Sequence, residues 1–294
     1  MQNLFHKLIA VDQNILTVIL ITIFFTIEQF LSRPPGFKKS GIHFLHGIPL
    51  QVGYMAVSYA LASVFVLSAQ WVKDYHFGVF NQIQIPFAAK IIAGLLCIDF
   101  TFYWAHRLYH TWALPWRLHR VHHSDTNVDS ATFFRFHPFD AVMDTTTIII
   151  ASALFGIDIS IVTLFFLINL VFTIAQHSKF VFPKWTDSIL GKVFMTPNLH
   201  KIHHHQNQFY TDSNFGLTFI IWDRIFGTYK YLPVKQIKYG LQEFDDNKKQ
   251  TFWYLLICPF KNIERVKKPK ESSLHVVTKN NNLVMSVRLD EKNI

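Results

Sequence analysis

The spacing of the histidines is the feature that most restricts what this 294-residue chain can become. Eleven of its sixteen histidines fall between residues 106 and 205. An H-x-x-x-H pair is followed by an H-x-x-H-H motif, and a second H-x-x-H-H motif comes roughly eighty residues later. On a helix, residues i, i+3 and i+4 share one face, so each motif should present its imidazoles in one direction.

Neutral imidazole is the commonest metal ligand in proteins and suits iron, zinc, copper and nickel. One metal ion takes about four to six ligands, so a larger set of histidines indicates two metal ions close together. The sequence predicts a di-metal site built from nine residues, which are His106, His110, His119, His122, His123, His177, His200, His203 and His204.

The composition is that of a membrane protein. Half of the residues are hydrophobic, 30 are phenylalanine, and only 16% are charged, against roughly a quarter in soluble domains. The net charge of +9 is spread over loops and the tail, which indicates anionic lipid or an acidic partner and not nucleic acid. Cys97 and Cys258 lie in apolar surroundings, so we expect neither a disulfide framework nor an iron–sulfur cluster.

Five apolar runs are candidates for membrane spans, which need about 20 residues. The first contains Glu28 and lacks a small-residue cleavage site, so it does not read as a signal peptide. The last two can be a hairpin of spans or a re-entrant pair, and the sequence leaves both open. We expect an all-α, polytopic membrane protein with a histidine-rich, di-metal helical cap, and runs at 14–31, 48–70, 86–104, 139–155 and 158–175.

Basic loops predict the orientation of the chain, because lysine and arginine accumulate on the cytoplasmic side of membrane proteins. With five spans, three basic regions fall on that side together with every histidine motif. They are the loop with Arg33, Lys38 and Lys39, the segment with Arg107, Arg117, Arg120 and Arg135, and the tail. We therefore divide the chain into N-terminal spans and loops (1–85), a catalytic domain with membrane helices (86–231) and a basic cytoplasmic tail with a poorly ordered end (232–294).

Other polar residues are weaker candidates for the site. His137 can be a tenth ligand or a residue that fixes its loop, and His205 points off the ligand face, about 140° from His200. Asp99 lies two helical turns before His106 and can orient a ligand imidazole. Similar supporting roles are open to Asp125, Asp129, Asn214 and Asp223, whereas His6, His43, His46, His76 and His275 lie outside any cluster and read as surface or interfacial residues.

These motifs, taken with their neighbours, resemble the fatty acid hydroxylase/sterol desaturase superfamily over roughly residues 90–230. The resemblance rests on segments that occur in the order of that family: DFTFYWAHRLYH (99–110), LHRVHHSD (118–125), SATFFRFHP (130–138), QHS (176–178), PNLHKIHH (197–204), NFG (214–216) and WDRIFGTY (222–229). One departure is Asp140, because the family pattern leads us to expect glutamate after the His-Pro pair.

The resemblance implies a membrane-bound oxidoreductase with a non-haem centre of two iron ions and O2 as co-substrate. Its substrate would be a lipid reached from the bilayer, and a sterol, a fatty acyl chain, a carotenoid or an ether lipid are all compatible. Hydroxylation and desaturation share the first hydrogen abstraction, and the sequence does not separate them.

Such chemistry needs two external electrons for each O2. The chain has no haem-peptide motif, cysteine cluster or nucleotide-binding glycine pattern, so we expect a separate donor such as a ferredoxin or a cytochrome b5-like carrier. From Lys230 onward there are 13 lysines and arginines against 7 acidic residues. Lys267, Lys268 and Lys270 are candidates for docking an acidic donor, and contact with lipid headgroups is the alternative.

Two other classes of protein compete with this prediction. A zinc-dependent membrane lipid hydrolase or lyase would use metal-bound water, but such sites usually combine three ligands with a carboxylate base. A bis-histidine haem electron carrier would leave most of the co-facial histidines unused. Metal analysis and an optical spectrum separate the three classes.

Overall fold

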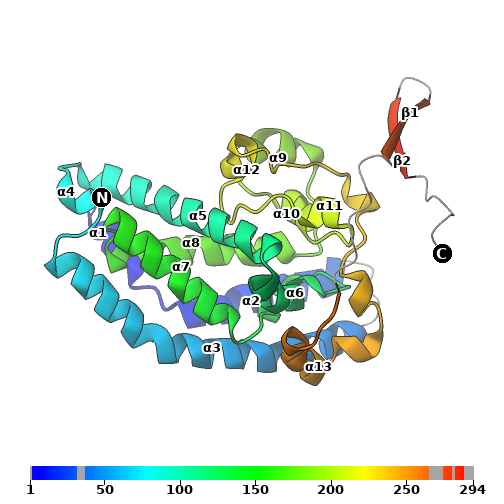
Figure 1. Cartoon of the computed structure of the whole chain (residues 1–294), viewed down its shortest axis with the longest axis horizontal. Coiled ribbons are helices and arrows are strands. Elements are labelled where there is room, and N and C mark those ends of the chain that lie inside the picture. The colour runs from blue at the N-terminus through cyan, green and yellow to red at the C-terminus, as the bar shows by residue number, and fades with distance from the viewer. Residues whose placement is uncertain (1, 32–36, 265–273, 280–281, 288–294) are drawn as a thin grey trace.

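A computed structural model describes residues 2–31, 37–264, 274–279 and 282–287, and it is helical apart from one hairpin (Figure 1). The helices are α1 (Gln2–Ile9), α2 (Gln13–Leu31), α3 (Phe37–Asp74), α4 (Val79–Gln82), α5 (Phe87–Thr111), α6 (Ala113–His123), α7 (Asp140–Phe155), α8 (Ile159–His177), α9 (Lys184–Ile189), α10 (Pro197–His203), α11 (Gln208–Thr211), α12 (Ile221–Ile225) and α13 (Phe252–Ile257). Short 3-10 turns cover Ser130–Phe134, Leu190–Lys192, Val234–Gln236, Gln242–Phe244, Asn247–Gln250 and Cys258–Phe260.

Strands β1 (Leu274–Lys279) and β2 (Asn282–Val287) pair antiparallel near the C-terminus, and these residues depart from the all-α expectation, which the rest of the described chain follows. Both strands are rich in β-branched and apolar residues, and this composition suits β-structure. Several residues used in the sequence-based predictions, namely Arg33, Lys267, Lys268 and Lys270, lie outside the described residues.

The long helices form a bundle in which α7 packs against both α3 and α5, and α8 packs against α5 and α2 (Figure 1). Apolar side chains of α5, α7 and α8 make its core, including Ile98, Phe102, Ile148, Ile161 and Phe165. The rings of Phe102 and Phe165 stack with centroids 5.9 Å apart. Burial of such side chains is the main favourable contribution to packing.

Three helical segments are long and apolar enough to cross a membrane, namely Phe44–Gln82, Phe87–Thr111 and Ile159–His177. A fourth is possible if the pair Gln2–Ile9 and Gln13–Glu28, bent by 74°, counts as one span. The five spans expected from the sequence are therefore not supported by length and composition. Helix α7 has 16 residues and measures about 24 Å, less than the roughly 30 Å of a bilayer core.

Helix α7 nevertheless runs between the same two ends of the bundle as its neighbours. It ends at Gly156 with a left-handed φ of 69°, and this residue packs directly against Gly78 in the turn between α3 and α4. The chain then reverses into α8 and returns to the histidine end (Figure 1). Helices α7 and α8 thus form a helical hairpin, of which α8 is a candidate span and α7 is shorter than one.

Buried Glu28 of α2 ties this outer helix to the loops beside the histidines. Its carboxylate accepts hydrogen bonds from Ser130 Oγ at 2.8 Å and from the backbone N of Lys179 at 2.7 Å. A carboxylate enclosed by apolar helices needs such partners. Leu50 of α3 and Leu255 of α13 belong to one buried apolar cluster, which also contains Trp116 and Val121 of α6. The N-terminal and C-terminal parts of the chain therefore both pack against the segment that carries the first histidines.

Candidate metal centre

All nine predicted ligands gather at one end of the bundle, where α5, α6, α8 and α10 meet. His106 and His110 lie in the last turns of α5, His177 is the last residue of α8, and the two H-x-x-H-H motifs end α6 and α10. Trp112 is extended between α5 and α6 and reverses the chain, while Thr196 caps α10 with Pro197 at its first position. Each of the nine is at most 8% exposed.

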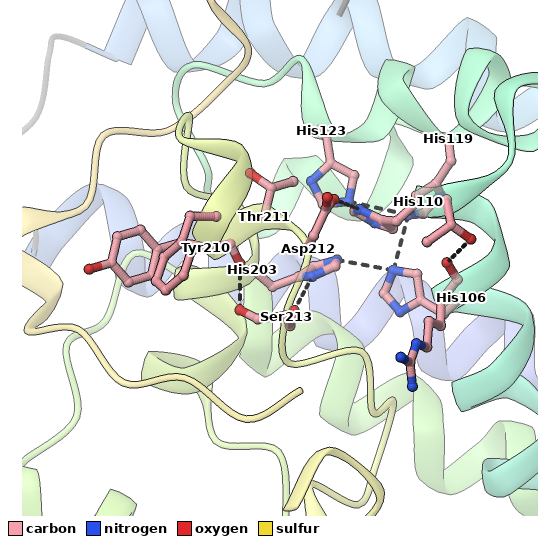
Figure 2. Close-up of polar contacts among 12 residues, drawn as sticks. His106, His110, His119, His123, His203, Tyr210, Thr211, Asp212 and Ser213 are labelled. Atoms are coloured by element: carbon pink, nitrogen blue, oxygen red, sulfur yellow. Dashed lines mark hydrogen bonds and ion pairs between the residues drawn. The ribbon is translucent and has the colours of Figure 1, made fainter. Parts of the chain in front are cut away.

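The nine imidazoles form two groups, and within each group the candidate ligand atoms lie within 4.8 Å of one another. The five-histidine group contains His106, His110, His119, His123 and His203, and the four-histidine group contains His122, His177, His200 and His204. Figure 2 shows the rings of the first group converging from α5, α6 and the 203–213 segment.

The two H-x-x-H-H motifs divide their histidines between the groups in opposite ways. In the first motif the middle residue, His122, joins the four-histidine group, and in the second the middle residue, His203, joins the five-histidine group. Adjacent residues on a helix are about 100° apart, so His122 and His123, or His203 and His204, point to different centres. The expectation of one common direction for each motif is therefore wrong.

Hydrogen bonds to the backbone fix the tautomers in the five-histidine group. Nδ1 of His106 is 2.8 Å from the carbonyl oxygen of Phe215, and Nδ1 of His203 is 2.7 Å from that of Ser213. A carbonyl oxygen only accepts, so both Nδ1 atoms carry hydrogen and both Nε2 atoms of the neutral rings present lone pairs. These two Nε2 atoms are 3.0 Å apart, and that of His119 is 3.1 Å from His106 Nε2.

The four-histidine group repeats this arrangement. His177 Nδ1 is 2.7 Å from the carbonyl oxygen of Thr173, which leaves a lone pair on Nε2. That Nε2 atom lies 3.1–3.2 Å from the Nε2 atoms of His122, His200 and His204. Four ring nitrogens thus converge at this distance, an arrangement that suits a cation bound between them. The donor set therefore fits a metal ion in each group.

The distances also match coordination geometry. Two imidazole nitrogens, each about 2.1 Å from one ion and about 90° apart, lie about 3.0 Å from each other. Burial and the nearby imidazoles lower the pKa of six of these histidines well below the usual value, so their rings are neutral and available as ligands. This applies to His119, His122, His123, His200, His203 and His204.

The segment 212–215 orients three of the imidazoles, and the sequence-based candidates missed most of it. Besides the carbonyls of Ser213 and Phe215, it supplies Asp212, whose Oδ1 is 3.3 Å from His110 Nδ1 (Figure 2). Outer partners of this kind fix the orientation of ligand rings. In the sequence, this segment is marked by the polar run Asp-Ser-Asn-Phe-Gly (212–216) soon after the second H-x-x-H-H motif. Only Asn214 of this run was among the predicted site residues.

Asp223 binds the backbone at the end of this segment, and Asp99 binds the backbone that follows it. Asp99 accepts hydrogen bonds from Thr218 N at 2.9 Å and Trp222 Nε1 at 2.8 Å, so its predicted contact with an imidazole is wrong. Asp223 accepts from Phe215 N at 2.8 Å and thereby holds the residue whose carbonyl receives His106. Burial raises the pKa of Asp223 to about 6.

The other polar candidates support loops. Asp125 accepts from Thr132 Oγ1 at 2.6 Å, and Asp129 caps the turn that begins at Ser130. Asn214 has a left-handed φ of 52° and bonds to the backbone of Leu199 and Lys230. These hydrogen bonds hold the loops that lie beside the histidines.

His137 and His205 belong to neither group. His137 Nε2 lies 3.1 Å from the carbonyl oxygen of Leu256 and its Nδ1 accepts from Phe139 N, so this residue fixes its loop. His205 Nδ1 accepts from Asn207 N at 2.7 Å, consistent with its predicted position off the ligand face.

A cavity of about 330 Å³ borders both histidine groups. His106 and His119 of one group and His122, His177 and His200 of the other line it. Its apolar lining comes from Phe102, Phe133, Phe136, Phe166, Leu170 and Leu217. A mainly apolar chamber with a few polar groups beside reactive residues is the usual form of a small-molecule site.

Residues 91–228 match the model of the fatty acid hydroxylase family, and this interval contains all nine histidines. This segment belongs to the fatty acid hydroxylase family. The resemblance expected from the sequence motifs is confirmed.

Curated relatives of the family act on several lipids. Alkylglycerol monooxygenase of Xenopus tropicalis is 31% identical over 173 residues, 57% of this chain and 36% of that protein. The ornithine lipid hydroxylase OlsE of Rhizobium tropici is 27% identical over 188 residues, 63% of this chain and 56% of that protein. Methylsterol monooxygenase 2-2 of Arabidopsis thaliana is 31% identical over 153 residues, 51% and 56% of the two chains. No solved structure matches this chain significantly.

Proposed function

We propose that the chain is a membrane-bound, O2-dependent lipid oxidoreductase that holds two iron ions, one in each histidine group. The observation that carries this proposal is the interleaving of nine buried imidazoles around one mostly apolar cavity. Iron bound there would supply the activation of O2 and the oxidation of a C–H bond, which ends in hydroxylation or desaturation.

The residues of the chain hold the ligands neutral, orient them and exclude water. The carbonyls of Thr173, Ser213 and Phe215 each fix an Nδ1–H, so the opposite nitrogen points toward the group. Phe136 stacks on His122 at 4.3 Å, and the Phe215 ring lies 5.2 Å from His110. Closing the site against water strengthens every electrostatic interaction within it.

The substrate we propose is a lipid that enters from the bilayer. The cavity is lined by side chains of α2, α3, α5, α7 and α8, and three of these helices, α3, α5 and α8, contain candidate spans. Monooxygenases and hydroxylases among the relatives are named for an alkylglycerol, an ornithine lipid and a methylsterol. These names support the class of substrate and leave its identity open.

Electrons would come from an external ferredoxin or cytochrome b5-like carrier, and we place the histidine end on the cytoplasmic side. Exposed Lys235, Lys248 and Lys261 lie in the basic C-terminal segment. Docking of an acidic carrier there predicts turnover that falls as ionic strength rises past about 0.1 M. The division into 1–85, 86–231 and 232–294 stays a prediction.

A zinc hydrolase or lyase fits the site less well. Catalytic zinc sites usually take three protein ligands and keep a position for water. Here nine imidazoles form two groups, and no glutamate joins either group among the described residues. The ligand set is therefore larger than zinc hydrolysis requires.

Turnover under ¹⁸O2 tests the proposed reaction. The full-length protein, loaded with iron and supplied with a reduced ferredoxin and an extract of its host lipids, should yield a lipid that carries one ¹⁸O atom or one new double bond. Release of a fatty acid by the zinc-loaded protein, without any O2-dependent product from the iron-loaded protein, would favour the hydrolase instead.

A further inference from the structure

One wall of the cavity is formed by polar side chains of α3, α5 and α7. We call it the acceptor wall, and it consists of Gln51, Tyr54, Tyr109, Asp140 and Asp144. Among the residues that the structure describes, no lysine or arginine lines this cavity, so the carboxyl groups of the wall meet no cationic side chain of either type there. The wall therefore presents excess hydrogen-bond acceptors to whatever enters.

Tyr54 and Tyr109 orient the carboxylate of Asp144. The Tyr54 hydroxyl donates to Asp144 Oδ2 at 2.8 Å, and the Tyr109 hydroxyl lies 3.4 Å from Asp144 Oδ1. A carboxylate has about four lone-pair sites, so two donors leave part of its capacity unused. Asp144 is only partly buried and lines the cavity.

Asp140, one helical turn earlier, is 2% exposed. Its Oδ2 accepts from the backbone N of His137 at 2.9 Å, whereas its Oδ1 has no donor among the residues that the structure describes. Gln51 Oε1 is likewise an enclosed acceptor without a donor in the described chain. Enclosed acceptors normally find a donor, and a ligand in the adjoining cavity can supply one.

Ring contacts connect the acceptor wall to both histidine groups. The Tyr109 ring lies 5.6 Å from that of His119 in the five-histidine group. The Tyr54 ring lies 6.0 Å from Phe136, which stacks on His122 of the four-histidine group. A group bound at the wall thus anchors a lipid beside the reactive end of the cavity.

We propose that the acceptor wall binds the hydrogen-bond-donating end of the substrate, an alcohol or a protonated amine, and excludes carboxylate and phosphate ends. An alcohol or an ammonium group supplies the donor that Asp140 and Gln51 lack. An anionic end would bring its charge against the oxygens of Asp140 and Asp144, and no lysine or arginine among the described residues lines the chamber to offset it. This inference rests on the proposed function, because it takes the cavity as the lipid site.

Binding of three probes with one chain length tests the inference without requiring turnover. Full-length protein in lipid nanodiscs is titrated with 1-hexadecanol, hexadecylamine or hexadecanoate, and affinity is obtained from the shift in thermal unfolding midpoint. We expect the alcohol or the amine, or both, to bind at least about tenfold more tightly than the carboxylate. The tighter of the first two identifies the donor.

The variant Asp140→Asn replaces one hydrogen-bond acceptor of the wall by a donor. Its carbonyl still accepts from His137, while its NH2 group puts a donor where Oδ1 was, so the preference for a donor should fall about tenfold and hexadecanoate should gain affinity. Gln51→Leu should lower the same preference by removing the other acceptor. Asp158→Asn is the control, because Asp158 is half-exposed and pairs with Lys90 at 2.9 Å. Iron content, measured on each sample, should be unchanged.

Hexadecanoate bound as tightly as both donors by the unaltered protein would overturn the inference. So would an unchanged preference in both Asp140→Asn and Gln51→Leu. Selective binding without any oxidised lipid would sustain the inference and contradict the proposed function. Oxidised lipid without selective binding would sustain the proposed function and contradict the inference.

Discussion

The rings of His123 and His204 stack with centroids 4.6 Å apart, although the two residues belong to different histidine groups. Each is the last histidine of its motif, one on α6 and one directly after α10. This contact brings the two groups side by side. Two ions held there would be near neighbours, as a reaction that reduces O2 at a pair of metals requires.

The division of each motif predicts that single histidine variants lose metal unequally. His122→Ala leaves three imidazoles in its group, whereas His110→Ala leaves four in the other. We expect His122→Ala to keep about one iron ion per chain and His110→Ala to keep more, since four imidazoles still meet the lower limit of iron coordination. Elemental analysis of purified variants measures this. His205→Ala should retain the full content, and an equal loss in that variant would contradict the assignment.

Asp212 should act as a positioning residue through His110. Replacing it by asparagine removes the carboxylate that faces His110 Nδ1 at 3.3 Å, and the loss of such an outer partner typically costs about 10- to 100-fold in metal affinity. Competition with a chelator measures the affinity directly. Asp245→Asn is the matched control, because Asp245 is exposed and pairs with Lys238 at 3.6 Å. Equal affinities in the two variants would show that Asp212 does not support the site.

The metal-free protein should lose stability as the medium becomes acidic. The six histidines of the two H-x-x-H-H motifs have pKa values well below the usual value. Below about pH 6.5 the unfolded chain therefore takes up protons that the native chain does not. Their contribution is complete above that pH and falls as the pH decreases. Asp223, with a pKa of about 6, acts in the opposite sense, as do Asp140 and Asp144, whose pKa values are also raised by burial, but the histidines outnumber these carboxyl groups.

Thermal unfolding of the metal-free protein measures this dependence. The midpoint at pH 5.5 should be lower than at pH 7.5. A midpoint that is equal or higher at pH 5.5 would mean that the histidines are not neutral in the native state.

The helical bundle predicts the sidedness of the two ends. Tyr75 is 70% exposed beside the turn that packs against Gly156, and exposed Lys248 lies in the C-terminal segment that packs beside the histidine end. In a background without Cys97 and Cys258, Tyr75→Cys should react with an impermeant maleimide on intact cells. Lys248→Cys should react only after permeabilisation. Labelling of both from one side would exclude our orientation.

Much of the site could be predicted from the sequence because metal ligands leave a regular spacing on helices. Eight of the nine histidines, and the position of His205 outside the groups, follow from that spacing, whereas His177 stands alone after an apolar run. The role of Asp212 could not be predicted, because its contact with His110 joins residues 102 positions apart. The contacts of Asp99 were missed for the same reason. The extent of α7 was predicted correctly as 139–155, but the number of spans was overestimated because this run was accepted although its 16 helical residues are fewer than the roughly 20 that a span needs.

Iron stoichiometry tests the central claim most directly. Full-length protein expressed with ample iron, purified in mild detergent and analysed by elemental analysis together with Mössbauer spectroscopy, should contain about two iron ions per chain in a nitrogen-rich, non-haem environment. Zinc in place of iron, a single iron ion per chain or a haem absorption spectrum would contradict the account.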